Sequence, residues 1–325
     1  MPRAYARGLL LYLANQEDFI MAGLSGALLG AVSQGVLWGI MVLGVYITFR
    51  LLNIADMTVD GSFALGGCVC AALIINHGMN PYLALIVAVG AGIVAGAVTG
   101  VLHTMFNIPA ILAGILTQIS LWSINLRIMG GKSNVPLLKA DTIISQLVEK
   151  IGSPNAIGSL IIGIIIVTAV ICVLYWFFGT EIGSSIRATG NNEDMIRALG
   201  VDIRKTKLLS LMISNALVAL SGALVCQSQK YGDVSMGQGA IVIGLAAIVI
   251  GEVLLGKIKP FWGKLLAIVI GSVVYFLIRA IVLQLGLNPN DMKLLSAIIV
   301  GLALCVPEAM KRSKEKHAYT EGDEE

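Results

Sequence analysis

Nine apolar stretches, each about long enough to cross a lipid bilayer, constrain the fold of this chain more than any other feature. Crossing about 30 Å of hydrocarbon takes roughly 20 apolar residues in a helix. Hydrophobic residues make up 57% of the chain and charged residues 13%, against about 45–50% and about 25% in a soluble domain. The pattern predicts an all-α polytopic membrane protein with about eight to ten transmembrane helices, and excludes a soluble enzyme or a nucleic-acid binder. The stretches are 23–49, 61–77, 81–103, 108–128, 156–178, 208–227, 236–255, 262–285 and 292–310.

Positive charges predict the orientation of the bundle, because loops rich in Lys and Arg stay on the cytoplasmic side. One cluster lies in the long loop 179–207 and another begins the C-terminal tail at Lys311. An even number of stretches separates them, so both clusters are expected in the cytoplasm. Arg50 falls on that side and the N-terminus on the other, although Arg3 and Arg7 oppose this placement. The expected organisation is an N-terminal extension at 1–22, a transmembrane domain at 23–310 and a charged cytoplasmic tail at 311–325.

A polar segment at 53–62 interrupts the apolar pattern. A carboxylate inside the bilayer is costly and is tolerated where it faces a cavity or the end of a helix. Asp60 or Ser62 can cap the free backbone N–H groups of a helix that starts here. Two interpretations stay open: a broken helix beside a substrate pathway, or a cytoplasmic loop with an ordinary helix cap. The candidates for the pathway are Asp56, Thr58, Asp60 and Ser62, with Gln118 and Asn215 as weaker ones.

The loop 179–207 contains a short helix of about two turns with its own start and stop signals. Asn191 is a favourable N-cap, and Glu193 and Asp194 suit the first turn. Gly200 suits the left-handed position after the last turn, with Val201 as its hydrophobic companion. A helix this short is unstable alone. We therefore expect it to dock on a partner, although a capped surface helix without one is the alternative.

An internal repeat is suggested by two similar segments. Asp56-Met57-Thr58-Val59 resembles Asp233-Val234-Ser235-Met236, and both precede a Gly-rich apolar stretch. The predicted orientation starts them on opposite sides of the membrane, which is the pattern of an inverted repeat in transporters.

No motif for bond chemistry is present in the sequence. The five cysteines and three histidines lack metal-ligand spacing, so we expect no metal and no cofactor. Residues 130–133 imitate the end of a phosphate-binding loop, but Leu126 stands where its first Gly is required. If ATP drives this protein, a separate chain must bind it.

Three motifs resemble the permease subunits of ATP-binding-cassette (ABC) importers. The class is that of the branched-chain amino acid and ribose permeases, and the nearest subgroup is the amino-acid permeases of the tryptophan or tyrosine type. The resemblance covers about residues 30–310. The motifs are LGVYITFR at 43–50 with IADMTVDGSF at 54–63, then RATGNN at 187–192 with ALGV at 198–201, and GQGAIVIGLAAIVIGE at 237–252.

This resemblance implies a multi-pass protein of the prokaryotic cytoplasmic (inner) membrane that is not itself an enzyme. It implies a pair of permeases in lipid, most simply a homodimer, two ABC ATPase subunits on the cytoplasmic side and an extracytoplasmic substrate-binding protein. The best match for the cargo is an aromatic amino acid. The short helix becomes a coupling helix that transmits closure of the ATPases, through Arg187, Gly190, Asn191, Glu193, Asp194, Arg197 and Gly200.

Two other classes remain as alternatives. An ion-coupled secondary transporter would need no ATPase and would use Asp56, Asp60 or Glu252 as proton or cation sites. A membrane enzyme fits less well, because the sequence shows no cluster of a nucleophile with a base.

Overall fold

The computed structural model describes residues 26–138, 140–152, 154–256 and 260–286, together with positions 258, 288, 291, 294, 296–298, 300–302 and 305. The described part is almost entirely helical, which confirms the all-α membrane fold. Seven of its helices are long and apolar enough to cross a membrane. They are Gly26–Leu51, α2 (Thr58–His77), α3 (Pro81–Thr104), α4 (Ala110–Ile128), α6 (Asn155–Gly179), α9 (Ile203–Gln229) and α11 (Phe261–Gln284).

The stretch predicted at 236–255 forms a shorter apolar helix, α10 (Ala240–Leu255). Most of the ninth predicted stretch, 292–310, lies outside the described residues, as do the extension 1–22 and the tail 311–325.

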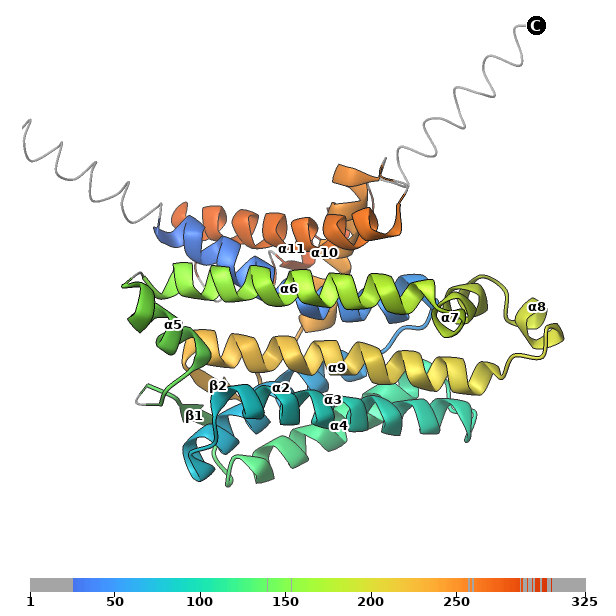
Figure 1. Cartoon of the computed structure of the whole chain (residues 1–325), viewed down its shortest axis with the longest axis horizontal. Helices are drawn as coiled ribbons and strands as arrows, with labels where there is room; N and C mark the ends of the chain where they lie inside the picture. Colours follow the sequence, from blue (N-terminus) through green and yellow to red (C-terminus); the bar gives the residue numbers. More distant parts are fainter. Residues whose placement is uncertain are drawn as a thin grey trace, which may run out of the picture.

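Short elements mark the two ends of the bundle. The helices α7 (Glu181–Asn191) and α8 (Glu193–Ala198) lie at one end. Strands β1 (Asn134–Pro136) and β2 (Tyr231–Asp233) lie at the other with helix α5 (Ile143–Ile151) (Figure 1). The two strands pair antiparallel, with Val135 opposite Gly232. By the distribution of Lys and Arg, the α7–α8 end is cytoplasmic.

Helices α3 and α9 meet along a line of glycines. A Cβ added to Gly92 or Gly96 would lie nearer than 3.0 Å to the carbonyl oxygen of Asn215 or of Leu211, respectively. The backbones are therefore in direct contact, which small residues permit inside a lipid bilayer. Helix α2 is the most buried span, whereas α4 keeps a broad apolar face exposed.

Two hydrogen bonds between the first helix and α9 join positions that correspond in the expected inverted repeat. The two similar segments start 177 positions apart, at 56 and 233. Ser214 donates its hydroxyl to the carbonyl of Gly44, and Ser221 donates to that of Leu37, each at 2.8 Å. A shift of 177 positions turns 37 into 214 and 44 into 221, so the two hydrogen bonds join corresponding pairs of positions, with donor and acceptor exchanged. The repeat expected from the sequence agrees with this pattern.

The two segments also share a local turn. The Oδ1 atom of Asp56 accepts the backbone N–H of Thr58 at 2.9 Å, and Oδ1 of Asp233 accepts that of Ser235 at 2.7 Å. Side chains of this type stabilise a turn by accepting the N–H two residues ahead.

Candidate functional site

The first helix ends in an irregular turn that leads the chain back into the bundle. Its last residues form a π-helical segment, η1 (Ile47–Leu51), and the amide of Leu52 bonds to the carbonyl of Ile47 at 3.1 Å. Asn53 follows with φ of 60°, in the left-handed region, where Asn is enriched. Wider turns of this kind are frequent at functional sites. The segment then enters α2.

Asp56 lies at the centre of a buried polar network. Its Oδ2 accepts Nδ2–H of Asn215 at 2.8 Å, and the hydroxyl of Ser62 donates to Oδ1 of Asn215 at 2.6 Å. All three side chains are at most 2% exposed. Asn215 lies near the middle of the 27-residue helix α9, so the polar segment at 53–62 reaches the interior of the bundle.

Three threonines extend the polar contacts toward α4. The hydroxyls of Thr58 and Thr99 lie 2.7 Å apart, and Thr99 donates to Thr117 at 2.9 Å. Thr117 in turn donates to the carbonyl of Ala113. No hydrogen bond among the described residues joins the side chain of Gln118 to this network, although its helix packs against Gly61. The network thus includes Asp56, Thr58, Ser62 and Asn215 but leaves Gln118 aside.

The carboxylate of Asp60, which belongs to α2, caps the N-terminus of helix α10. Its carboxylate accepts the backbone N–H groups of Gly239 at 2.9 Å and of Ile241 at 3.0 Å, in the first turn of α10. The expectation that Asp60 or Ser62 caps α2 is wrong. The N-cap residue of α2 is Met57, Asp56 accepts the N–H of Thr58 in an adjoining turn, and Ser62 bonds to α9. A carboxylate at a helix N-terminus also interacts favourably with the helix dipole. Helix α10 therefore begins inside the bundle, beside α2.

The cytoplasmic end carries the short helix expected in the loop 179–207. It is α8, and its N-cap is Asn192, whose Oδ1 accepts the N–H of Met195 at 3.0 Å. The prediction of Asn191 as the N-cap is wrong by one residue, because α7 continues through Asn191. The predicted end is confirmed: Gly200 has φ of 83°, and the amide of Val201 bonds back to Ile196. This is the usual glycine-terminated helix end.

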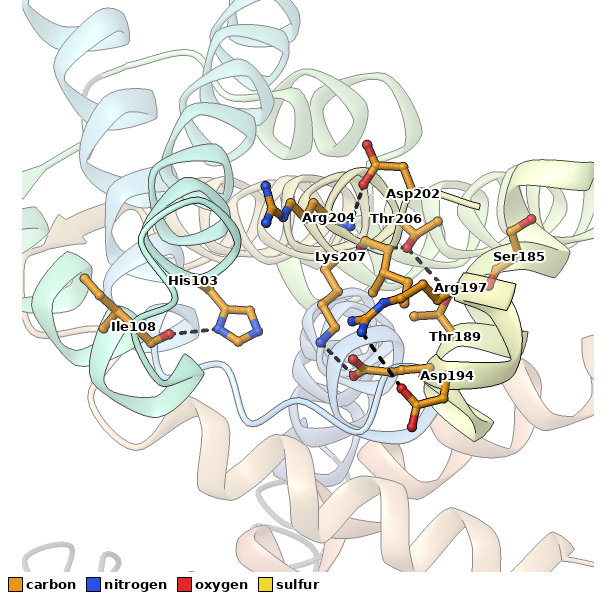
Figure 2. A network of polar contacts seen from close by, with 12 residues as sticks. His103, Ile108, Ser185, Thr189, Asp194, Arg197, Asp202, Arg204, Thr206 and Lys207 are labelled. Carbon is orange, nitrogen blue, oxygen red and sulfur yellow. Dashed lines mark hydrogen bonds and ion pairs between the residues drawn. The ribbon is translucent and has the colours of Figure 1, made fainter. Parts of the chain in front are cut away.

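Helix α8 is joined to α9 by an ion pair of Lys207 (Figure 2) and carries exposed side chains elsewhere on its surface. The Nζ of Lys207 on α9 lies 2.6 Å from Oε1 of Glu193, and Ile196 is only 4% exposed. Asp194 and Arg197 form an exposed pair at 4.0 Å, with 96% and 70% of their side chains accessible. The ion pair thus attaches α8 to the start of α9, and the buried Ile196 marks the inner side of α8.

Two apolar side chains on the outer side of α8 were not singled out from the sequence. Met195 is 53% exposed and Leu199 is 70% exposed. They lie four positions apart and so share one face of the helix. The sequence shows an apolar stripe here but not which of its members faces solvent.

Helix α7 rests directly on the end of the first helix. A Cβ at Gly190 would overlap the carbonyl oxygen of Leu51, so only Gly allows this approach. The guanidinium of Arg187 lies 5.3 Å from the centre of the Phe261 ring, at the start of α11. Arg187 and Gly190 therefore connect the α7–α8 segment to two spans.

A polar cavity of about 320 Å³ separates α8 from the turn between α3 and α4. His103 lies on its wall, and its Nδ1 is 2.9 Å from the carbonyl oxygen of Ile108 (Figure 2). Lys207, Arg197 and Arg204 contribute cationic groups and Glu193 an anionic one. The region next to α8 is therefore basic.

Comparison with known proteins gives one family and several relatives. A family model described as the permease component of a branched-chain amino acid transport system matches residues 20–305. A tyrosine transport system permease protein of Clostridioides difficile is 38% identical over 273 residues, which are 84% of this chain and 88% of that protein.

Two further relatives are more distant. An uncharacterized protein of Rickettsia prowazekii is 32% identical and covers 85% of this chain and 96% of its own length. A fructose import permease protein of Bifidobacterium longum is 24% identical, over 92% of this chain and 82% of its own. No solved structure matches the chain.

Proposed function

Because this chain belongs to the family of permease components of branched-chain amino acid transport systems, we propose that it lines half of the translocation pathway for an aromatic amino acid. The chain is the membrane-spanning permease subunit of an ABC importer and a multi-pass protein of the cytoplasmic membrane. The choice of cargo is supported by the relative named for tyrosine transport, which is 38% identical. A second copy of this chain supplies the other half of the pathway.

The coupling role is carried by one observation, the two-sided arrangement of α8. Its inner side is attached to α9 through Glu193 and buries Ile196, while Met195 and Leu199 are exposed. An ATPase subunit that buries these two side chains pushes α8, and the contacts of Arg187 and Gly190 pass the displacement to α11 and the first helix. Asn191, Asp194, Arg197 and Gly200 shape the same surface. A capped helix fixed at both ends moves as one body, which suits alternating access.

The proposed pathway runs beside the break between the first helix and α2. Discontinuous helices border the substrate site in many transporters, because their ends offer unpaired backbone groups and dipoles. Here Asp60 holds the start of α10, and Asp56, Thr58, Ser62 and Asn215 hold the start of α2. Gln118 remains a candidate on the neighbouring face of α4.

The two ends of the bundle suit different partners. The ATPase subunits bind at the α7–α8 end, where Lys207, Arg197 and Arg204 accumulate positive charge. The substrate-binding protein docks at the opposite end, formed by β1, β2 and α5 (Figure 1). The binding protein sets most of the specificity.

Uptake by the reconstituted transporter tests the function. Radiolabelled tyrosine and tryptophan should enter vesicles only when the binding protein, the ATPase subunits and ATP are all present. Uptake that persists without ATPase and follows an ion gradient would establish the ion-coupled alternative instead. Fructose and leucine serve as control cargoes.

Co-purification tests the coupling surface. The double variant Met195→Glu with Leu199→Glu should lose the ATPase subunits, because two carboxylates then replace the apolar side chains that the ATPase is proposed to bury. Leu138→Glu is the matched control, since Leu138 is 75% exposed at the opposite end. Equal recovery of the ATPase with both variants would reject the role of α8.

A further inference from the structure

A large cavity lies at the cytoplasmic end of the bundle, on the side of α7 away from the basic region. It has a volume of about 640 Å³ and opens between the end of α6, the start of α7 and the start of α11. Aromatic rings dominate its lining. The residues are Tyr175, Trp176, Phe178, Gly179, Thr180, Arg187, Pro260, Phe261 and Trp262.

Arg187 carries the only formal charge among these nine lining residues. Its Nε atom is buried and has no hydrogen-bond partner among the described residues. Its guanidinium faces the ring of Phe261 at 5.3 Å. A buried N–H donor without a partner is uncommon in a folded protein, so the described residues leave the Arg187 guanidinium without its full set of acceptors. Because Nε itself is buried, an acceptor that enters the cavity meets the terminal nitrogens of the guanidinium. A phosphate oxygen is a suitable one, because the guanidinium fork matches phosphate geometry.

The neighbouring hydroxyl is not available as a second donor. Thr180 donates its Oγ1–H to the carbonyl of Phe177 at 2.6 Å and accepts the N–H of Gly183 at 3.3 Å. Arg187 is therefore the lining residue that offers an anion a positive charge, beside the neutral donors of Tyr175, Trp176 and Trp262.

The aromatic side chains place the cavity at the membrane boundary. Trp176 is 72% exposed, Tyr175 is 53% exposed and Trp262 is 52% exposed. Trp and Tyr are enriched at the level of the lipid headgroups. All three lie within a turn or so of the cytoplasmic ends of α6 and α11. An occupant must therefore combine a negative group with an apolar body.

We propose that this cavity binds an anionic glycerophospholipid of the cytoplasmic leaflet, with its phosphate on Arg187 and its acyl chains against Trp176 and Trp262. Basic pockets between transmembrane helices on the cytoplasmic side bind such headgroups. A free phosphate ion would leave the aromatic wall uncovered. The lipid joins α7, which precedes the coupling helix, to α11, and so becomes part of the path along which the ATPase signal travels. The binding itself does not depend on the proposed function.

Tryptophan fluorescence provides the test, because the chain has four tryptophans and two of them line the cavity. The variant Trp38→Phe with Trp122→Phe retains the two cavity residues. The variant Trp38→Phe, Trp176→Phe, Trp262→Phe retains Trp122, which is 45% exposed on α4, as the reference for bulk lipid. Both are reconstituted in phosphatidylcholine with a small mole fraction of brominated phosphatidylglycerol.

We expect quenching of the cavity tryptophans to exceed that of Trp122 several-fold. Arg187→Ala should abolish the excess, and Arg187→Lys should keep part of it because the charge remains. Excess inorganic phosphate should not displace the lipid. Equal quenching at the two positions, or an excess that survives Arg187→Ala, would overturn the proposal, and so would displacement by inorganic phosphate.

Native mass spectrometry of the chain with its tryptophans intact covers the case in which Trp38→Phe fails to fold. Co-purified phosphatidylglycerol should be present on the unmodified permease and absent after Arg187→Ala; equal retention would contradict the proposal. The quenching is then repeated in the complete transporter. Loss of the excess when the ATPase subunits bind would assign the cavity to them instead of to lipid.

Discussion

Arg50 and Glu252 join the ends of two helices that lie 202 positions apart in the chain. Nε of Arg50 donates to Oε1 of Glu252 at 2.8 Å, and a second guanidinium nitrogen contacts the other carboxylate oxygen. Arg50 belongs to η1 and Glu252 to the last turns of α10. The two side chains are 48% and 37% exposed, so the pair contributes only about 0–1 kcal/mol to stability.

The first prediction concerns this pair. Arg50→Glu and Glu252→Arg should each reduce ATP-driven uptake, because like charges then separate the ends of the first helix and α10. The double variant with the charges exchanged should restore part of the uptake. ATPase-dependent transport in proteoliposomes measures all three. A double variant no better than the worse single one would show that the pair has no role in transport.

The second prediction concerns the cap of α10. Asp60→Ala removes the acceptor of two backbone N–H groups and should destabilise the protein by about 0.5–2 kcal/mol, the range for a lost N-cap. Asp60→Asn keeps one acceptor oxygen and should fall between. Thermal unfolding in detergent measures both. Asp194→Ala is the control, because the side chain of Asp194 is 96% exposed; equal effects at both positions would contradict the cap.

The third prediction concerns Gly237, whose position corresponds to that of Asp60 in the internal repeat. A Cβ at Gly237 would overlap the backbone carbonyl oxygen of Asp60, and a backbone atom cannot rotate away. Gly237→Ala should therefore cost about 1–3 kcal/mol and lower uptake. Gly30→Ala should cause no loss, since no atom lies within 4 Å of its added Cβ. Thermal unfolding measures the stability of both variants. Equal stabilities of Gly237→Ala and Gly30→Ala would contradict the close contact between Gly237 and the Asp60 carbonyl.

The fourth prediction contrasts two buried asparagines. Asn125 is 1% exposed, and neither atom of its amide has a hydrogen-bond partner among the described residues. Asn125→Leu should raise stability by about 1–3 kcal/mol, since it removes an unpaired buried group. Asn215→Leu should lower stability, because it leaves Asp56 and Ser62 without their partner. A loss of stability from both substitutions would show that the amide of Asn125 is satisfied in the membrane.

The fifth prediction is a pH dependence at the outer end of the bundle. Desolvation raises the pKa of Asp233, but hydrogen bonds from Ser235 and Asn134 lower it more, and the pKa lies below its usual value of 3.8. The ionised form is therefore favoured by folding. The ionised carboxylate of Asp233 stabilises the folded protein at pH values above its pKa in the unfolded chain. This stabilisation is lost as the pH falls through its pKa in the folded protein.

The Asp233→Asn variant provides the comparison, since its amide resembles the protonated acid. The wild type should be more stable than the variant at neutral pH, and the difference should shrink as the pH falls below 3.8. A stability difference between wild type and variant that stays constant with pH would contradict the lowered pKa of Asp233. Thermal unfolding across the pH series measures it.

Much of the fold could be predicted from the sequence, because hydropathy and helix caps are local signals. The apolar stretches coincide with the seven long helices and α10. The stop signal at Gly200 and Val201 was correct because it depends on backbone conformation alone. The start signal was wrong by one residue, since Asn191 and Asn192 are both good caps and only the packing of α7 against Leu51 selects between them.

The rest depends on contacts between distant segments, which no local pattern contains. Asp56 and Asn215 are 159 positions apart, and Asp60 and Gly239 are 179 apart. The sequence indicated polar groups at these positions but not their partners. For the same reason it did not show that Met195 and Leu199 are exposed while Ile196 is buried.

The line of glycines between α3 and α9 decides which parts of the permease can move. Gly92 and Gly96 bring backbone against backbone, so no side chain is present that could change rotamer to let the helices slide. On their other flank, an apolar cavity of about 430 Å³ separates this pair from α6. The α3–α9 contact therefore resists sliding, and a relative movement of helices is expected at the border with α6, where the cavity leaves the packing loose.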